Sequence, residues 1–128
     1  VVLVGVSRTS KTPLSIYLGY LGYKAANVPI VKGVELPAAL YEIDRAKIVG
    51  LTIDAQRLAE IREERVRSMG APRSRYADLE AVYQELETAE AVHRRLGCPV
   101  IDVSELSVEE TAMRIIKVVD HRLRRASR

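Results

Sequence analysis

The hydrophobic positions change period along the chain in a way that predicts strands alternating with helices. Val1 to Val4 is a continuous apolar run that ends at Gly5, a pattern typical of a strand buried on both faces of a parallel sheet. Further strands are expected at 25–31, 47–53 and 98–103. The segments 25–31 and 98–103 each contain a proline, Pro29 and Pro99, which weakens them as strands.

Between the strands, apolar residues recur at steps of three and four, which predicts amphipathic helices. The first holds Pro13 in its first turn and ends at Gly22, and others are expected at 55–69 and about 77–96. The last helix begins at a capping box formed by Ser107 and Glu110 and buries one apolar stripe, namely Val108, Ala112, Ile115, Ile116 and Val119. This order of elements predicts an α/β layer architecture with a mostly parallel sheet.

Composition narrows the class of protein. The 128 residues, 48% of them hydrophobic, predict one compact domain, and the net charge of +3 argues against a dedicated nucleic-acid binder. No apolar run reaches the roughly 18 residues of a membrane span. The single cysteine, Cys98, fits a reducing compartment, so a cytoplasmic location is expected. Because the chain opens inside an apolar run, we expect it to be a piece of a longer protein.

The clearest chemical signal lies between the first strand and the first helix. There the sequence reads Gly5, Val6, Ser7, Arg8, Thr9, Ser10, Lys11 and Thr12. A phosphate-binding loop needs inward backbone N–H groups, a helix N-terminus, a lysine for the terminal phosphates and a hydroxyl for Mg²⁺. Gly5, Lys11 and Thr12 occupy the corresponding places. The sequence therefore predicts a three-layer P-loop kinase-like domain with a mostly parallel sheet.

Two residues of this loop depart from or add to the usual pattern. Ser10 stands where glycine is usual, so it must accept an unusual backbone angle or signal a different loop path. Arg8 would add a guanidinium where charge builds on a transferring phosphoryl group. The alternative is an ordinary strand-to-helix turn in which Ser10 or Thr12 caps the helix.

Arginines gather around the predicted helix break at 70–72. A helix-break-helix segment can close over a nucleotide as a lid and bring arginines to its phosphates. The lid candidates are Arg62, Arg65 and Arg75, and Arg62 and Arg65 are expected to share a helix face. The alternative is a solvated helix whose arginines pair with its own glutamates.

Carboxylates also follow predicted strands. Asp54 and Asp102 come at the carboxyl ends of the third and fourth strands, where parallel sheets place their ligand crevice. Both are candidates for a general base or a Mg²⁺ partner, and Asp54 is the better one. In the alternative, Asp54 caps the following helix and Asp102 fixes the loop before Ser107. His93 and Cys98 are interpreted as core residues.

Longer segments of the chain carry a family resemblance. They are 5–13 (GVSRTSKTP), 26–29 (ANVP), 50–54 (GLTID), 61–65 (IREER), 75–79 (RYADL) and 98–104 (CPVIDVS). Together they resemble the bacterial pyruvate, phosphate dikinase regulatory proteins, a family shared with the phosphoenolpyruvate synthase regulatory proteins. The resemblance implies proteins about twice this length, with an N-terminal domain before the loop that this chain lacks.

The resemblance also implies a bifunctional activity. Such proteins use ADP to phosphorylate a threonine of the dikinase, which inactivates it, and use inorganic phosphate to remove that group and release pyrophosphate. The ADP site would map to 5–12, with Lys11, Arg8 and Asp54 as catalytic candidates and Mg²⁺ held through Thr12. The partner would be the dikinase or the synthase, and a homodimer remains open. The alternatives are an ATP-dependent small-molecule kinase and a nucleotide-binding regulatory module without catalysis.

Overall fold

The computed structural model describes residues 1–68, 70 and 78–126. A parallel sheet at its centre has the order β2-β1-β3-β4. The strands are β1 (Val2–Gly5), β2 (Ala26–Pro29), β3 (Ile48–Thr52) and β4 (Val100–Asp102). The helices are α1 (Lys11–Tyr20), α2 (Ala55–Ser68), α3 (Leu79–Leu96) and α4 (Val108–Ala126), with short 3-10 helices at Ala38–Glu42 and Arg45–Lys47.

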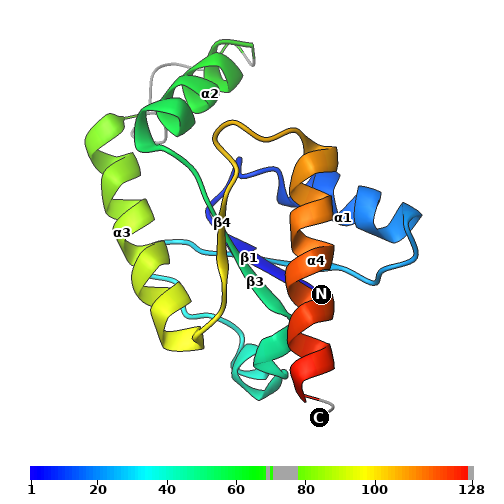
Figure 1. The fold of residues 1–128 in the computed structure, drawn as a ribbon. Coiled ribbons are helices and arrows are strands. Elements are labelled where there is room, and N and C mark those ends of the chain that lie inside the picture. Colours follow the sequence, from blue (N-terminus) through cyan, green and yellow to red (C-terminus); the bar gives the residue numbers. More distant parts are fainter. Residues whose placement is uncertain (69, 71–77, 127–128) are drawn as a thin grey trace.

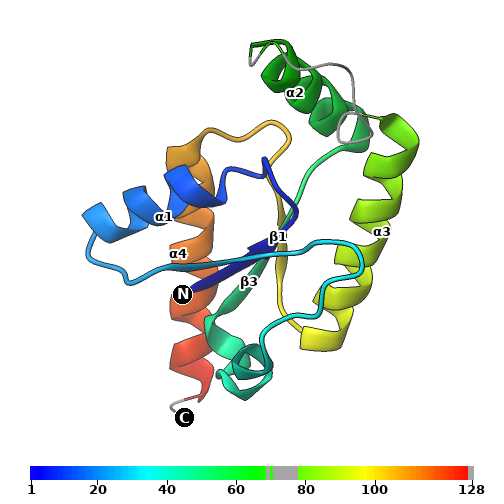
Figure 2. The same cartoon turned by 180° about the vertical axis from the view of Figure 1, so that it is seen from behind.

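The helices form layers on both sides of the sheet. Helices α1 and α4 pack together on one face, and α3 covers the other (Figures 1 and 2). Helix α2 follows the carboxyl end of β3 directly and packs against α3. The predicted three-layer α/β architecture with a parallel sheet is confirmed. Because all strands run the same way, the loop after β1 and the start of α2 lie at the same edge of the sheet.

The strands are shorter at the sheet edges than the sequence predicted. Strand β1 is buried along its whole length and pairs with β2 on one side and β3 on the other. The edge strands β2 and β4 consist of the residues that pair in register with β1 and β3, respectively, and β2 ends at Pro29. Just outside these bounds, Ile30, Pro99 and Val103 still form single backbone hydrogen bonds to β1 or β3, at 3.0, 2.8 and 2.8 Å, without continuing the paired register.

The helix boundaries follow the predicted local signals. Gly97 ends α3 with a left-handed φ of 62°. The Glu110 amide donates to Ser107 Oγ at 3.1 Å, and the Ser107 amide donates to Glu110 Oε1 at 3.2 Å, so the capping box at α4 is confirmed. Of its predicted stripe, Ala112, Ile115 and Val119 are buried, while Val108 and Ile116 are partly buried against the core.

His93 lies buried between α3 and the sheet, as predicted. Its Nε2 lies 2.9 Å from the Val4 carbonyl oxygen, and burial lowers the pKa of its imidazole. The neutral ring therefore donates from Nε2 to the strand. Cys98 precedes β4 and is partly buried, and burial raises the pKa of its thiol. His93 thus bonds to β1 itself, at Val4.

Gly50 of β3 leaves the space that His93 occupies. A Cβ at this position would lie 2.6 Å from His93 Cδ2 and 2.7 Å from its Nε2. We expect Gly50→Ala to lower the free energy of unfolding by about 2 kcal/mol, because the ring must move and give up its bond to Val4. Urea unfolding measures this loss. Gly19→Ala is the matched control, because a Cβ there meets nothing within 4 Å.

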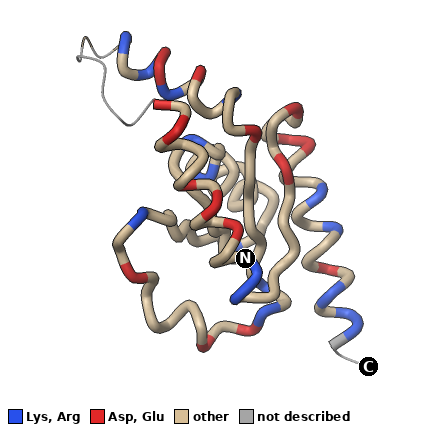
Figure 3. Tube along the Cα trace, turned by 90° about the vertical axis from the view of Figure 1, so that its left-hand side faces the viewer, with Lys and Arg blue, Asp and Glu red and all other residues tan. Residues whose placement is uncertain are grey.

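Charged residues are mixed over the helices. Figure 3 shows Lys and Arg interspersed with Asp and Glu along the chain, in agreement with the small net charge of +3. Across the part of the chain that the structure describes, no helix is both long and apolar enough to cross a membrane.

Candidate phosphate-binding site

The loop between β1 and α1 turns sharply through two left-handed residues. Arg8 has a φ of 67° and Ser10 a φ of 65°. The Ser10 carbonyl accepts from the Leu14 amide at 2.9 Å and so starts the helix. Ser10 was expected either to accept an unusual backbone angle or to signal a different loop path, and the structure shows the unusual angle. Gly5 fits here because a Cβ would lie 2.9 Å from the Leu51 carbonyl oxygen.

The backbone angle of Ser10 leads to a stability prediction. A left-handed conformation costs a residue with a Cβ about 1–2 kcal/mol, and glycine avoids this cost but loses more entropy on folding. We expect Ser10→Gly to raise the free energy of unfolding by about 0.5 kcal/mol, measured by urea unfolding. Ser10→Val should lower it by more than about 1 kcal/mol, because branching at Cβ increases the strain. A stabilising valine would contradict this account.

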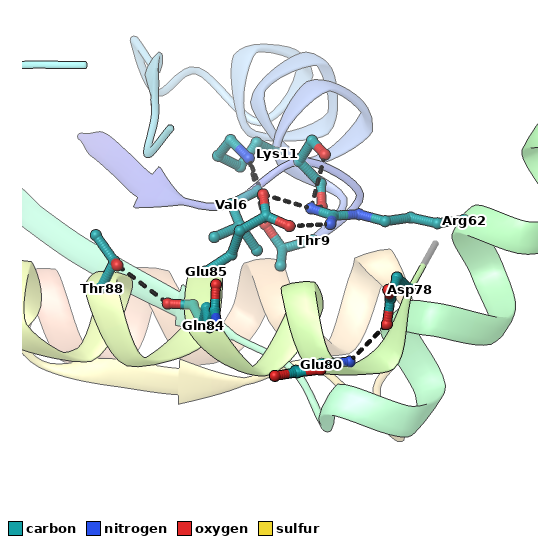
Figure 4. Close-up of polar contacts among 10 residues, drawn as sticks. Val6, Thr9, Lys11, Arg62, Asp78, Glu80, Gln84, Glu85 and Thr88 are labelled. Carbon is teal, nitrogen blue, oxygen red and sulfur yellow. Dashed lines mark hydrogen bonds and ion pairs between the residues drawn. The ribbon is translucent and has the colours of Figure 1, made fainter. Parts of the chain in front are cut away.

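Lys11 begins α1 and turns back into the loop. Its side chain is buried, and Nζ donates to the Val6 carbonyl and to Thr9 Oγ1, the latter at 3.3 Å (Figure 4). Thr9 Oγ1 itself donates to the Val6 carbonyl at 2.8 Å. Thr9 is fully buried, so this small network fixes the curvature of the loop. The ammonium group is therefore held at the centre of the loop.

The surroundings of Lys11 disfavour its charge. Burial and, to a smaller extent, the positive charge of Arg62 together lower the pKa of the ammonium to about 8. An anion bound in the loop would reverse both effects, because it pairs with the buried cation. A negatively charged ligand at this loop would therefore be favoured over a neutral one.

The lowered pKa of Lys11 has a measurable effect on stability. Between about pH 8 and the ordinary lysine value of 10.5, the unfolded chain keeps a proton that the folded chain has lost, so raising the pH favours the folded state. Relative to Lys11→Met, the wild-type chain should gain about 2 kcal/mol in unfolding free energy from about pH 8 to about pH 10. Parallel urea titrations of the two proteins measure the difference. Identical pH dependence would contradict the lowered pKa.

Arg62 of α2 reaches the loop from the other side. Its guanidinium is fully buried, and Nη2 donates to Ser7 Oγ at 3.0 Å and to the Ser7 carbonyl at 3.4 Å. Nη1 forms an ion pair with Glu85 of α3, and Nη2 lies 3.4 Å from the second carboxylate oxygen of Glu85. Figure 4 shows this guanidinium between α3 and the loop. Two buried cations, Lys11 and Arg62, therefore converge on one loop.

The other lid candidates are placed differently. Arg65 lies one turn after Arg62 on α2, but it is exposed whereas Arg62 is buried, so burial separates the two candidates. Arg67 forms an ion pair with Glu63 at 3.5 Å on the surface. This matches the alternative interpretation, in which α2 is a solvated helix whose arginines pair with its own glutamates. Arg75 lies outside the described residues.

Glu85 was not among the residues expected at the site. The signal that was available is its spacing, because Val82, Glu85 and Ala89 lie at steps of three and four on the apolar row of α3. A carboxylate in such a row calls for a cationic partner. Only the packing of α2 on α3 shows that this partner is Arg62.

The two strand-end carboxylates bond to their own loops. Asp54 Oδ2 accepts from the Arg57 amide at 3.1 Å, so it caps α2. Asp102 Oδ1 accepts from the Ser104 amide at 2.9 Å, and Ser104 Oγ lies 2.8 Å from the Asp54 amide. These bonds match the capping and loop-fixing alternatives, and Asp54 lines a separate small cavity together with Ser104. The role of Asp54 as a base stays a prediction.

An open cavity of about 570 Å³ lies over the loop. Its lining consists of Ser7, Arg8, Ser10, Lys11, Thr12, Pro13, Asn27, Pro29 and Ile61. The volume falls within the range of small-molecule sites. Thr12 is exposed in the first turn of α1, so its hydroxyl would be accessible to a Mg²⁺ ion bound beside the loop. The structure thus brings the whole predicted loop together with one lid candidate, Arg62.

The architecture and the loop define a three-layer α/β protein with a candidate anion site at the carboxyl end of β1. The chain belongs to the kinase/pyrophosphorylase family, whose sequence profile matches residues 1–116.

Curated relatives are similar over nearly the whole chain. A protein of Cutibacterium acnes named “Putative pyruvate, phosphate dikinase regulatory protein” is 58% identical over 126 residues, covering 97% of this chain and 43% of its own length. One of Syntrophomonas wolfei, the second protein of that name, is 48% identical over 96% of this chain and 45% of its own length. A third protein with this name, from Halothermothrix orenii, is 54% identical over 91% of this chain and 44% of its own length. The chain therefore spans less than half the length of these relatives.

Proposed function

We propose that this chain provides the nucleotide site of a bifunctional phosphotransferase that regulates pyruvate, phosphate dikinase. In one direction it phosphorylates a threonine of the dikinase with ADP, and in the other it removes the phosphate with inorganic phosphate and releases pyrophosphate. The observation that carries the proposal is the convergence of buried Lys11 and Arg62 on the loop at the end of β1. The family description and the names of the relatives support the same chemistry.

The forward reaction needs mainly positioning and charge neutralisation. The threonine hydroxyl attacks the β-phosphorus of ADP, a new P–O bond forms, and the bond to the bridging oxygen breaks to release AMP. Lys11 and the loop N–H groups hold the β-phosphate, and Arg8, exposed at the cavity, neutralises charge on the transferring group. Asp54 is the proposed acceptor of the threonine proton. Bound Mg²⁺ would neutralise phosphate charge beside Thr12.

The reverse reaction uses the same groups. An oxygen of inorganic phosphate attacks the phosphorus of phosphothreonine, the bond to the threonine oxygen breaks, and pyrophosphate leaves. The threonine oxygen takes up a proton, for which Asp54 in its acid form is the proposed donor. In both directions a phosphoryl group is transferred within the same loop. Lys11 and Arg8 therefore stabilise the same negative charge on that group in the transition state.

Nucleotide titration is the direct test of the site. The chain is titrated by calorimetry with ADP, ATP and GTP in the presence of Mg²⁺, and we expect binding of adenine nucleotides. ATP turnover without a protein acceptor would instead support a small-molecule kinase. A folded chain that binds no nucleotide would contradict the proposed site.

Phosphate transfer is tested with a protein substrate. The chain and the full-length Cutibacterium acnes relative are incubated with pyruvate, phosphate dikinase and ADP labelled at the β-phosphate, and label on a dikinase threonine is measured. Asp54→Asn in the active protein tests the base, because full activity in that variant would remove the role. Label transferred from ATP alone would contradict the choice of donor.

A further inference from the structure

Glu85 occupies a position on α3 that otherwise belongs to the core. It lies between buried Val82 and Ala89 on the same helix row, and its side chain is 24% exposed. Its partner Arg62 is 0% exposed. A buried ion pair contributes little to stability compared with apolar packing, so its presence at a core position is weak evidence for a purely stabilising role.

The pair connects α3 to the loop through a single guanidinium. Both Nη atoms of Arg62 contact the Glu85 carboxylate, and Nη2 also donates to Ser7 Oγ and the Ser7 carbonyl. Ser7 immediately precedes Arg8, the first left-handed residue of the loop. The Glu85 carboxylate therefore sets the direction from which Arg62 meets the turn.

We propose that Glu85 is a positioning residue that holds the Arg62 guanidinium against the phosphate-binding loop. The proposal rests on the proposed function and adds a residue to it. A loop already fixed in its binding geometry loses less conformational entropy when the ligand binds, so its affinity is higher. Glu85 is not among the residues that line the cavity, and its described bonds go to Arg62, which in turn bonds to Ser7.

Three roles for Glu85 predict different outcomes for Glu85→Gln. A positioning role predicts weaker ADP binding, because glutamine keeps the shape but loses the charge that orients Arg62. A simple electrostatic role predicts tighter binding, because a negative charge near the anion site is removed. A purely structural clamp between α2 and α3 predicts a lower unfolding temperature with unchanged affinity.

The experiment measures ADP affinity and loop protection in the 128-residue chain. Glu85→Gln should bind ADP about tenfold more weakly by calorimetry, and Glu85→Asp, which keeps the charge, should recover part of the affinity. Glu90→Gln is the matched control on the same helix, because Glu90 pairs with Arg94 at 3.3 Å on the exposed surface. Its affinity should stay within about twofold of the wild-type value. Unchanged or tighter binding in Glu85→Gln overturns the proposal.

Amide hydrogen exchange in the absence of nucleotide separates this proposal from the proposed function. Faster exchange at 6–9 in Glu85→Gln, with unchanged exchange in the core of α4, shows that Glu85 fixes the loop. Equal exchange at 6–9 overturns the proposal even if ADP binds. If the wild-type chain binds no ADP, the proposed function fails, and the exchange data alone decide whether Glu85 positions the loop.

Discussion

Lys11→Ala should weaken ADP binding by between about tenfold and a hundredfold, the largest effect on affinity expected from a single change in the loop. The ammonium lies at the centre of the loop and bonds to Val6 and Thr9. A charge-assisted hydrogen bond to phosphate is worth about 1.5–3 kcal/mol, and about 1.4 kcal/mol corresponds to a factor of ten. Calorimetric titration with ADP and Mg²⁺ measures the loss.

The variant is expected to remain folded. Burial lowers the pKa of Lys11, which means that its charged form is disfavoured in the folded chain, so alanine removes an unfavourable charge along with the packing of the stem. Lys117→Ala on the exposed side of α4 is the matched control and should leave affinity unchanged. Undiminished ADP binding by Lys11→Ala would show that the loop is not the phosphate site.

The parts of the site that the sequence predicted depend on neighbours along the chain. The loop from Gly5 to Thr12 and the capping box at Ser107 are local patterns, and each fixes its geometry within a few residues. The same holds for Gly97, where only a left-handed residue ends the helix well. Local signals of this kind can be interpreted without knowledge of the packing.

The parts that the sequence did not predict depend on contacts between elements. Arg62 and Arg65 are both arginines on one helix, and only the position of α3 decides that the first is buried and the second exposed. Glu85 was missed for the same reason, because its partner is 23 residues away. The edge strands were predicted too long because the apolar content of a run does not show how many of its residues pair in register with a neighbouring strand.

Arg62→Ala is expected to produce the largest loss of stability, about 3 kcal/mol in the free energy of unfolding. The change leaves the Glu85 carboxylate in a core row without its ion pair and opens a cavity where the largest fully buried side chain stood. Breaking a buried pair by removing one partner costs about 3–5 kcal/mol, and the partial exposure of Glu85 places the expected loss at the lower end. Urea unfolding followed by circular dichroism measures it.

Arg65→Ala separates this effect from the general loss of an arginine on α2. Arg65 is exposed one turn further along the same helix, so its removal should change the unfolding free energy by less than about 0.5 kcal/mol. The double variant Arg62→Met with Glu85→Leu replaces the pair by apolar side chains and should regain much of the lost stability. The affinity of this double variant for ADP should nevertheless stay below that of the wild-type chain, because neither residue then orients the loop. If Arg62→Ala were as stable as Arg65→Ala, the buried ion pair would contribute nothing to the packing of α2, and its retention beside Ser7 would be explained by the loop alone.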